Sequence, residues 1–369
     1  MFQQTQRIIA SYLILLLLLG CVSFLLADEI SPDSVVIWGP VLGMIDGRGF
    51  VRIDAKVPIR ASLKVNGKLV PQDVSQLSHR QELQFPENLT GRFSYQITAR
   101  YGFDDRFTLG PYDARLPGEP GRNQRFVVYG DNRGESPVHY EITGRILDSD
   151  PDFVLNTGDL VDDGHEWVDW QVFRRTTGEL LARRIMIPCL GNHDKRSIHY
   201  FEAFHLPGNE AWFEWDWGPL RLLALDSNLP PEEQDWQTRW LNEKLAKPKK
   251  DGCITMVMFH HPPIGSGRHR PWKYGLEHWV PLIMSQPVDL VLLGHNHLYE
   301  RLEYQGTPFI VTGGGGAPLY PDFERIPKTI TVEAVWHFVV VQYDGERVLG
   351  KAIRHDGSTI EQWEYTPKY

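Results

Sequence analysis

Five short segments of this chain join the pattern of a buried strand to residues that bind metal ions. Most begin with an apolar run, and each ends in a carboxylate, amide or imidazole side chain. Apolar runs bounded by glycine are typical of buried strands, and α/β sheets hold their sites just beyond the carboxyl ends of such strands. Converging on one edge, these segments would supply enough ligands for two divalent ions. The segments are residues 126–131, 153–159, 185–194, 256–261 and 289–297.

The length and the charge of the chain limit its class and its partners. The 369 residues are 42% hydrophobic and 23% charged, which suits two domains with a sizeable core. The formal net charge is −9, whereas nonspecific nucleic-acid binding requires a basic surface that releases counterions. We therefore expect no nucleic acid as a specific partner.

The N-terminus has the pattern of an export signal. Arg7 precedes the uncharged, Leu-rich residues 8–27, and Asp28 follows them. Such a segment is a secretory signal peptide or an uncleaved signal anchor, which would attach the protein to a membrane. A lipoprotein site at Cys21 fits less well, because apolar residues follow it. We predict that residues 1–27 direct export, which places the rest in the periplasm, outside the cell or on the outer face of a membrane.

Two different patterns divide the rest of the chain. Residues 28–110 alternate in polarity between turn signals, which predicts six or seven strands in an all-β, immunoglobulin-like sandwich. Residues 111–123 are rich in Pro and Gly and are predicted to be a linker. In residues 124–369, strands alternate with helices expected at about 137–147, 167–181 and 231–246. This alternation predicts an α/β sandwich of two sheets flanked by helices.

The order of the motifs resembles the calcineurin-like metallophosphoesterase superfamily. The resemblance covers about residues 122–369. Residues 297–301 and the loop 312–318 resemble the purple acid phosphatase branch, in which a fibronectin type III-like domain precedes the metallophosphoesterase domain. The motifs are GD at 130–131, GD at 158–159, GNHD at 191–194, HH at 260–261 and GHNH at 294–297.

The resemblance implies a dinuclear metal centre and assigns its ligands. Asp159 would bridge the ions, because its two oxygens can hold both at a separation of ~3.5–4 Å. Asp131 and His297 would join it on the first ion. The ligands implied for the second ion are Asn192, His260 and His295, with His261 supporting its neighbour.

The first motif departs from the superfamily pattern. Many members begin Asp-x-His, whereas Arg133 stands here at the third position, and a guanidinium stays protonated and cannot ligate a cation. A water, Asp162 or His139 would have to supply the missing ligand. Arg133 suits a phosphate oxygen, although a salt-bridged surface arginine is the alternative. For His139, a capping or core role is the stronger alternative.

The second departure concerns the metal. Purple acid phosphatases place a tyrosine three residues after the bridging aspartate, and its phenolate binds ferric iron. This chain has Asp162 there, so we do not expect an Fe(III)-tyrosinate centre. Oxygen and imidazole ligands suit Mn, Zn or Fe as divalent ions.

Three further residues are candidates for catalysis or substrate binding. His193 would donate to a phosphate oxygen or protonate the leaving group. Asp194 would hydrogen-bond that imidazole and orient it, with a helix N-cap as the alternative. His269 lies between two arginines in a Gly-rich loop, where it would contact an anionic substrate or simply be solvated.

The resemblance implies hydrolysis of a small phosphate ester, with an acid-phosphatase-like phosphomonoesterase as the first expectation. The same metal core also serves phosphodiesterases of nucleotides or lipid headgroups, so that alternative stays open. A cell-surface binding protein with a degenerate scaffold is a third alternative, against which the complete ligand set argues.

Overall fold

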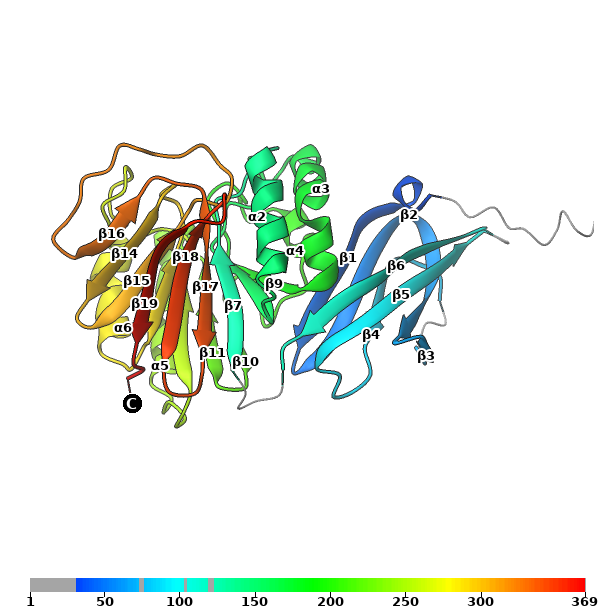
Figure 1. Ribbon diagram of the computed structural model, residues 1–369, viewed down its shortest axis with the longest axis horizontal. Coiled ribbons are helices and arrows are strands. Elements are labelled where there is room, and N and C mark those ends of the chain that lie inside the picture. Colours follow the sequence, from blue (N-terminus) through cyan, green and yellow to red (C-terminus); the bar gives the residue numbers. More distant parts are fainter. Residues whose placement is uncertain (1–30, 73–75, 103–104, 119–122, 369) are drawn as a thin grey trace, which may run out of the picture.

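The computed structural model describes residues 31–72, 76–102, 105–118 and 123–368, which form two domains (Figure 1). The export signal predicted for residues 1–27 lies outside these residues. Within the described ranges, no helix has the length and the apolar character needed to cross a membrane.

The described part of the N-terminal domain is all-β, as predicted. After a short 3-10 turn, η1, the long strand β2 pairs with β1 and β4 along its first part and with β3 and β5 along its second. The fibronectin type of this domain stays a prediction. The elements are η1 (Pro32–Ser34), β1 (Val36–Ile45), β2 (Arg48–Val65), β3 (Lys68–Val70), β4 (Ser78–Gln84), β5 (Gly91–Tyr101) and β6 (Asp105–Leu116).

The boundary of this domain lies later than the sequence indicated. Strand β6 pairs antiparallel with β5 as far as Leu116, which faces Gly91. The segment 111–116, predicted to be linker, therefore belongs to the sheet. Pro111 suggested a break in regular structure, but after an irregularity between Leu109 and Tyr112 the pairing with β5 resumes and continues to Leu116.

The C-terminal domain contains two sheets in its described residues, as predicted. One has the order β19-β18-β17-β7-β8-β9, with β7, β8 and β9 parallel. The other has the order β10-β11-β12-β13-β15-β14-β16, with a parallel centre formed by β11, β12, β13 and β15. The strands of the first sheet are β7 (Gln124–Tyr129), β8 (Phe153–Asn156), β9 (Ile185–Pro188), β17 (His337–Tyr343), β18 (Val348–Arg354) and β19 (Thr359–Tyr365). Those of the second are β10 (Phe213–Trp217), β11 (Leu220–Ala224), β12 (Ile254–Met258), β13 (Leu290–Leu293), β14 (Tyr299–Tyr304), β15 (Thr307–Thr312) and β16 (Thr329–Glu333).

Helices cover the outer faces of both sheets. The three expected helices are α2 (Pro137–Asp148), α3 (Trp167–Arg183) and α5 (Pro231–Leu245). Sequence patterns did not indicate the short helices α4 (Ile198–Ala203) and α6 (Val280–Met284), the latter preceded by the π-helical turn η2 (Gly275–Trp279). Helices α2, α3 and α4 lie between the first sheet and the N-terminal domain (Figure 1), whereas α5 and α6 pack on the second sheet.

The packing of the two sheets brings five strand ends to one edge. Every residue of β8, β9, β12 and β13 is buried, as expected for strands covered on both faces. Between the sheets, the ring of Phe153 on β8 meets that of Trp215 on β10 edge-on, with centroids 5.0 Å apart. The loops after β7, β8, β9, β12 and β13 therefore meet at a common edge.

Asp150, in the turn after α2, joins the two domains. Its carboxylate accepts hydrogen bonds from Arg92 (2.5 Å) and Arg115 (2.7 Å) of the N-terminal domain. It also accepts one from Arg184 (2.8 Å) of its own domain. The Arg184 side chain is only 6% exposed, so loss of its partner would leave a buried charge uncompensated.

We predict that Asp150→Ala lowers the free energy of unfolding by about 2 kcal/mol, less than for a fully buried pair because Asp150 is partly exposed. Chemical denaturation of the full chain measures this effect. The exposed Asp148 at the end of α2 provides the matched control, and Asp148→Ala should change stability by no more than about 0.5 kcal/mol. Equal stability of the two variants would contradict the bridging role of Asp150.

Candidate metal centre

The loops that carry the predicted ligands have strained backbones held by hydrogen bonds. Asp131, Asp159 and His295 adopt left-handed conformations, with φ of 55°, 56° and 68°. Such conformations are uncommon outside glycine and cluster at functional sites. The Asp131 N–H donates to the Gly158 carbonyl (2.9 Å), and the His295 N–H donates to the Asp131 carboxylate (2.8 and 3.0 Å). The loops after β7, β8 and β13 are thereby bonded to one another.

The loops also approach one another so closely that two motif positions must be glycine. A Cβ at Gly158 would lie 2.6 Å from the Gly191 nitrogen, and the φ of Gly158 is +94°. A Cβ at Gly191 would lie 2.2 Å from the Asp159 nitrogen. The loops after β8 and β9 therefore touch through their backbones.

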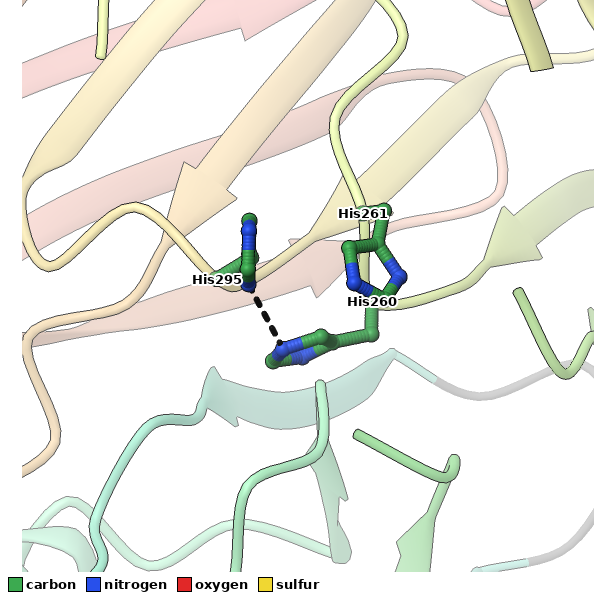
Figure 2. Close-up of side chains that lie close together, drawn as sticks. All are labelled: His260, His261 and His295. Carbon is green, nitrogen blue, oxygen red and sulfur yellow. Dashed lines mark hydrogen bonds between the residues drawn. The ribbon is translucent and has the colours of Figure 1, made fainter. Parts of the chain in front are cut away.

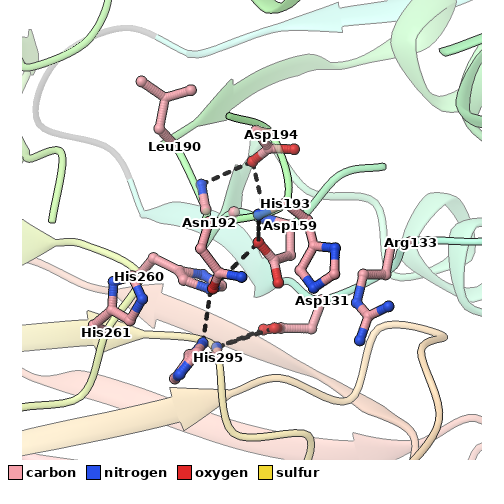
Figure 3. Close-up of polar contacts among 12 residues, drawn as sticks. Asp131, Arg133, Asp159, Leu190, Asn192, His193, Asp194, His260, His261 and His295 are labelled. Atoms are coloured by element: carbon pink, nitrogen blue, oxygen red, sulfur yellow. Dashed lines mark hydrogen bonds and ion pairs between the residues drawn. The ribbon is translucent and has the colours of Figure 1, made fainter. Parts of the chain in front are cut away.

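The four ligands predicted for the second ion converge on one point (Figure 3). His260 Nε2 lies 3.1 Å from Asn192 Oδ1, 3.3 Å from His295 Nδ1 and 3.4 Å from Asp159 Oδ1. Donor atoms bound at ~2.1 Å to one tetrahedral cation are roughly 3.4 Å apart. The donor set and its spacing therefore fit a divalent cation.

The ligands predicted for the first ion form an adjoining group. Donor atoms of Asp131, Asp159 and His297 all lie within 4.8 Å of one another, and His297 Nε2 is 3.4 Å from Asp131 Oδ1. All three residues are buried. Because Asp159 belongs to both groups, it has the position expected of a bridging carboxylate.

Hydrogen bonds orient two of the imidazoles for metal binding. Nδ1 of His260 faces the Thr157 carbonyl at 2.8 Å, and Nδ1 of His297 faces the Pro318 carbonyl at 2.5 Å. A carbonyl oxygen only accepts hydrogen bonds, so each Nδ1 must carry a proton. Nε2 is then the nitrogen of each ring that can coordinate a metal ion. Such outer partners commonly fix the tautomer of a metal ligand.

The electrostatics of the pocket favour positive charge. Burial by itself would lower the pKa of His260, but the carboxylates of Asp159 and Asp131 overcome it and raise this pKa to about 9. Burial would likewise raise the pKa of Asp159, yet His260 and His193 hold it well below the ordinary range. A pocket that stabilises an imidazolium and an ionised carboxylate in its interior also suits a divalent cation.

His261 lies beside the second group, as expected for a supporting residue. Donor atoms of His260, His261 and His295 all lie within 4.8 Å of one another (Figure 2). Nδ1 of His261, however, bonds to Ser227 Oγ at 2.8 Å. Burial and the neighbouring His260 lower its pKa to about 3, so the ring is neutral.

The loop after β11 was missed as part of the site. Ser227 holds His261, and the Asn228 amide donates to the Leu190 carbonyl (3.0 Å) in the loop after β9. The signal was present, because the apolar residues 222–225 end at Asp226. This is the same pattern that identified the other five segments.

Asp194 does not orient His193, contrary to the sequence-based prediction. Its buried carboxylate accepts the backbone N–H groups of Asp159 (3.0 Å), Leu160 (2.9 Å) and Gly191 (2.8 Å). Burial and the nearby Asp159 raise the pKa of Asp194 to about 7, while the backbone donors act in the opposite direction. The carboxylate is therefore directed at backbone N–H groups rather than at His193, and it joins the loops after β8 and β9.

We predict that Asp194→Asn weakens metal binding by roughly 10–100-fold, because an amide cannot accept at both ends and the two loops would separate. Titration of the apoprotein with Mn²⁺ or Zn²⁺ measures this. His193→Ala is the control, since it removes an imidazole but no loop contact made by Asp194. If Asp194→Asn keeps wild-type metal affinity and copies the kinetics of His193→Ala, the original assignment is right.

His193 is oriented by a backbone carbonyl. Its Nδ1 lies 2.6 Å from the Asp162 carbonyl oxygen, so Nδ1 carries the proton and Nε2 is free. Its backbone N–H donates to Asp159 Oδ1 (2.9 Å). In Figure 3 the imidazole lies beside the Arg133 guanidinium, which places both predicted substrate-contacting groups on the same side of the site.

The two residues proposed as replacements for the missing histidine lie elsewhere. The Asp162 carboxylate forms an ion pair with Arg133 (2.9 Å), and its side chain is 50% exposed. His139 is buried between Tyr129 and Phe173, with ring centroids 6.0 and 6.4 Å away, and burial lowers its pKa to about 3. His139 thus has the core role, and Asp162 has Arg133 as its partner.

We predict that Asp162→Asn retains the metal content of the wild type, because the carboxylate is not a ligand. Releasing Arg133 from its ion pair should tighten binding of inorganic phosphate about twofold to fivefold. Arg133→Lys should weaken phosphate binding without loss of metal, since a point charge replaces a planar fork. Loss of one ion per chain in Asp162→Asn, measured by elemental analysis, would show that Asp162 is a ligand.

The mouth of the site contains one aromatic residue that sequence analysis missed. The ring of Tyr320 stacks on His297 with centroids 4.0 Å apart and planes 9° apart. His269, a predicted substrate residue, lies between His295 (4.3 Å) and Tyr320 (5.3 Å), and the Arg268 guanidinium lies 5.3 Å from the Tyr320 ring. No sequence motif indicated Tyr320, because it follows an irregular loop rather than a strand.

Residues 124–299 match the family model for calcineurin-like phosphoesterases. The match covers just under half of the chain and identifies these residues as a calcineurin-like phosphoesterase domain. A purple acid phosphatase from yellow lupin (Lupinus luteus) seeds has a similar fold, with a TM-score of 0.75 and 18% identity over 89% of this chain and 74% of the other.

Curated relatives of this phosphoesterase domain include proteins named as phosphodiesterases and proteins named as phosphatases. A probable cyclic nucleotide phosphodiesterase of Rhodococcus erythropolis is 31% identical over 176 residues, which are 44% of this chain and 56% of that protein. The acid phosphatase type 7 of Homo sapiens is 29% identical over 243 residues, 57% of this chain and 54% of that protein. The chain therefore spans little more than half the length of these two relatives.

Proposed function

We propose that this protein is a metal-dependent hydrolase of phosphate esters that acts as an acid-phosphatase-like phosphomonoesterase. The observation that carries the proposal is the pair of ligand groups that share Asp159. The residues of these two groups would hold two divalent cations, which would supply Lewis acidity toward phosphoryl oxygens and lower the pKa of a water molecule so that hydroxide is available near neutral pH.

The protein's own residues have separate tasks in this proposal. Arg133 offers N–H donors to the phosphoryl oxygens and balances charge that develops on them. His193 faces the same space, and its Nε2, when protonated, transfers a proton to the leaving oxygen. The Asp162 carbonyl keeps that nitrogen available, because it accepts from Nδ1 at 2.6 Å. His269 and Tyr320 form the wall against which the rest of the substrate would rest.

A phosphodiesterase is the second candidate function. It is supported by the relative named as a cyclic nucleotide phosphodiesterase and by the charge at the mouth. The Asp162 carboxylate, 2.9 Å from Arg133, neutralises the cation that would receive the phosphate. A monoester dianion would be repelled by this carboxylate more strongly than a diester monoanion.

Export of the protein remains a proposal that rests on residues 8–27.

We predict that Asp159→Asn and His295→Ala each retain less than about a tenth of wild-type turnover with saturating metal, since each removes a ligand from the centre. The assay compares a nitrophenyl monoester, a bis-nitrophenyl diester and a cyclic nucleotide with Mn²⁺, Zn²⁺ and Fe²⁺. His278→Ala, an exposed histidine on η2, is the control and should be fully active. A soluble, folded wild type that hydrolyses none of the three esters would refute the proposed function.

We predict that the iron-loaded protein lacks an intense visible charge-transfer band. Asp162 occupies the position of the phenolate ligand, and Tyr129, next to the first ligand, is fully buried with a pKa raised by burial. Among the described residues, Tyr320 is the tyrosine whose ring stacks on His297, a predicted ligand. A strong band after aerobic loading with iron, lost in Tyr320→Phe or Tyr129→Phe, would contradict the prediction.

A further inference from the structure

The loop that carries Asn192 and His193 runs directly into α4. This helix has six residues, too few to be stable by itself in water. The Ser197 hydroxyl caps its first turn by accepting the Tyr200 N–H (3.3 Å). The hydroxyl of the fully buried Tyr200 donates to the Pro188 carbonyl (3.2 Å) at the end of β9. Both ends of the loop are therefore attached to α4, and the loop moves when this helix moves.

The carboxyl end of α4 is held by the N-terminal domain. Arg52 of β2 and Arg80 of β4 both donate to the Glu202 carbonyl, the latter at 3.2 Å. The indole N–H of Trp38 on β1 donates to the Ala203 carbonyl (2.9 Å). The last carbonyls of a helix have no partner within it and carry partial negative charge, so cationic donors from outside stabilise this end.

These three side chains are fixed for this contact by their own surroundings. Trp38 is 2% exposed and stacks on Phe173 of α3, with centroids 6.2 Å and planes 13° apart. Arg52 is 4% exposed. A two-point ion pair with Asp54 (2.9 and 2.8 Å) orients Arg80, the geometry that makes such pairs strong.

We infer that the N-terminal domain is a positioning element of the metal centre, in which Trp38, Arg52 and Arg80 fix α4 and through it the Asn192–His193 loop. The match to the phosphoesterase family begins at residue 124, so the family assignment gives the preceding domain no role. The inference rests on the proposed function for its kinetic consequence, but its consequence for metal binding does not depend on that function.

The test compares variants of two residues that contact α4 with a variant that removes a different contact between the domains. Arg80→Ala and Trp38→Phe remove hydrogen bonds to α4, whereas Arg92→Ala removes one to Asp150, in the turn after α2. Arg80 lines a cavity of about 310 Å³ between the domains, so water can replace its side chain and the variant should fold. Trp38→Phe keeps an aromatic ring in the core and deletes the indole N–H, but the smaller ring also loses packing volume, so part of its effect should be a lower Tm.

In the full chain, Arg80→Ala and Trp38→Phe should lower kcat roughly tenfold, with KM within about twofold, because a ligand and the proton donor lose their positions. One of the two metal ions, the one bound by Asn192, should bind roughly tenfold more weakly. Arg80→Lys should recover much of both losses, since a cation still reaches the Glu202 carbonyl. Arg92→Ala should lower Tm while kcat and both metal affinities stay at wild-type values.

Two outcomes separate failure of this inference from failure of the proposed function. If Arg80→Ala and Trp38→Phe only lower Tm, as Arg92→Ala does, the domain is a structural support and the inference is wrong. If the wild type hydrolyses no phosphate ester, the proposed function fails. The metal titration then still decides whether the N-terminal domain positions Asn192.

Discussion

The buried carboxylate of Asp194 is the contact on which the metal centre depends. By accepting three backbone N–H groups, it joins the loop after β8 to the loop after β9. The same contact requires Gly158 and Gly191 to meet without side chains. The shared Asp159 and the amide of Asn192 can face one point only because these two loops touch. A charge-assisted acceptor is well suited to the task, since each backbone donor would otherwise be buried without a partner.

The pocket also buries several carboxylates whose negative charge bound cations would neutralise. Asp131, Asp159 and Asp194 are each at most 1% exposed, and a buried ionised carboxylate is costly unless it is paired. Asp194 is paired by backbone N–H groups, whereas Asp131 and Asp159 face imidazoles at 3.4 Å. The same carboxylates raise the pKa of His260, which shows that they stabilise a positive charge next to them. Divalent ions would meet it while leaving the histidines neutral, which is the form that ligates.

The domain interface extends this dependence beyond the phosphoesterase domain. Asp150 binds two arginines of the N-terminal domain, and two others cap the carboxyl end of α4. The first contact holds the domains together. The second ends on the helix that follows the metal loop, so stability and ligand geometry are coupled through one surface. An appended β domain can in this way act on a site to which it contributes no ligand.

Local patterns of the sequence were sufficient to predict the strands that lead into the motifs, the three long helices and the polar residues that follow those strands. An apolar run ending in a polar residue marks a strand end, and parallel strands end at the same edge, so Asp131, Asp159, His260 and His295 were expected to meet. Helices α2, α3 and α5 followed from their apolar periodicity. Helix α4 did not, because six residues held by Trp38 and two arginines have no periodicity of their own.

The sequence could not determine the hydrogen-bond or ion-pair partner of each polar side chain. Asp194 next to His193 suggested a hydrogen bond between adjacent residues, but its partners lie in the loop after β8 and across the turn at Gly191. Asp162 and His139 were plausible ligands by distance along the chain, yet one pairs with Arg133 and the other lies in the aromatic core. The sequence determined which polar residues follow the buried strands, because strand ends can be located from periodicity, and the resemblance to a family suggested their roles. The partners were decided by tertiary structure, because hydrogen bonds and ion pairs depend on distances between segments that are remote in sequence.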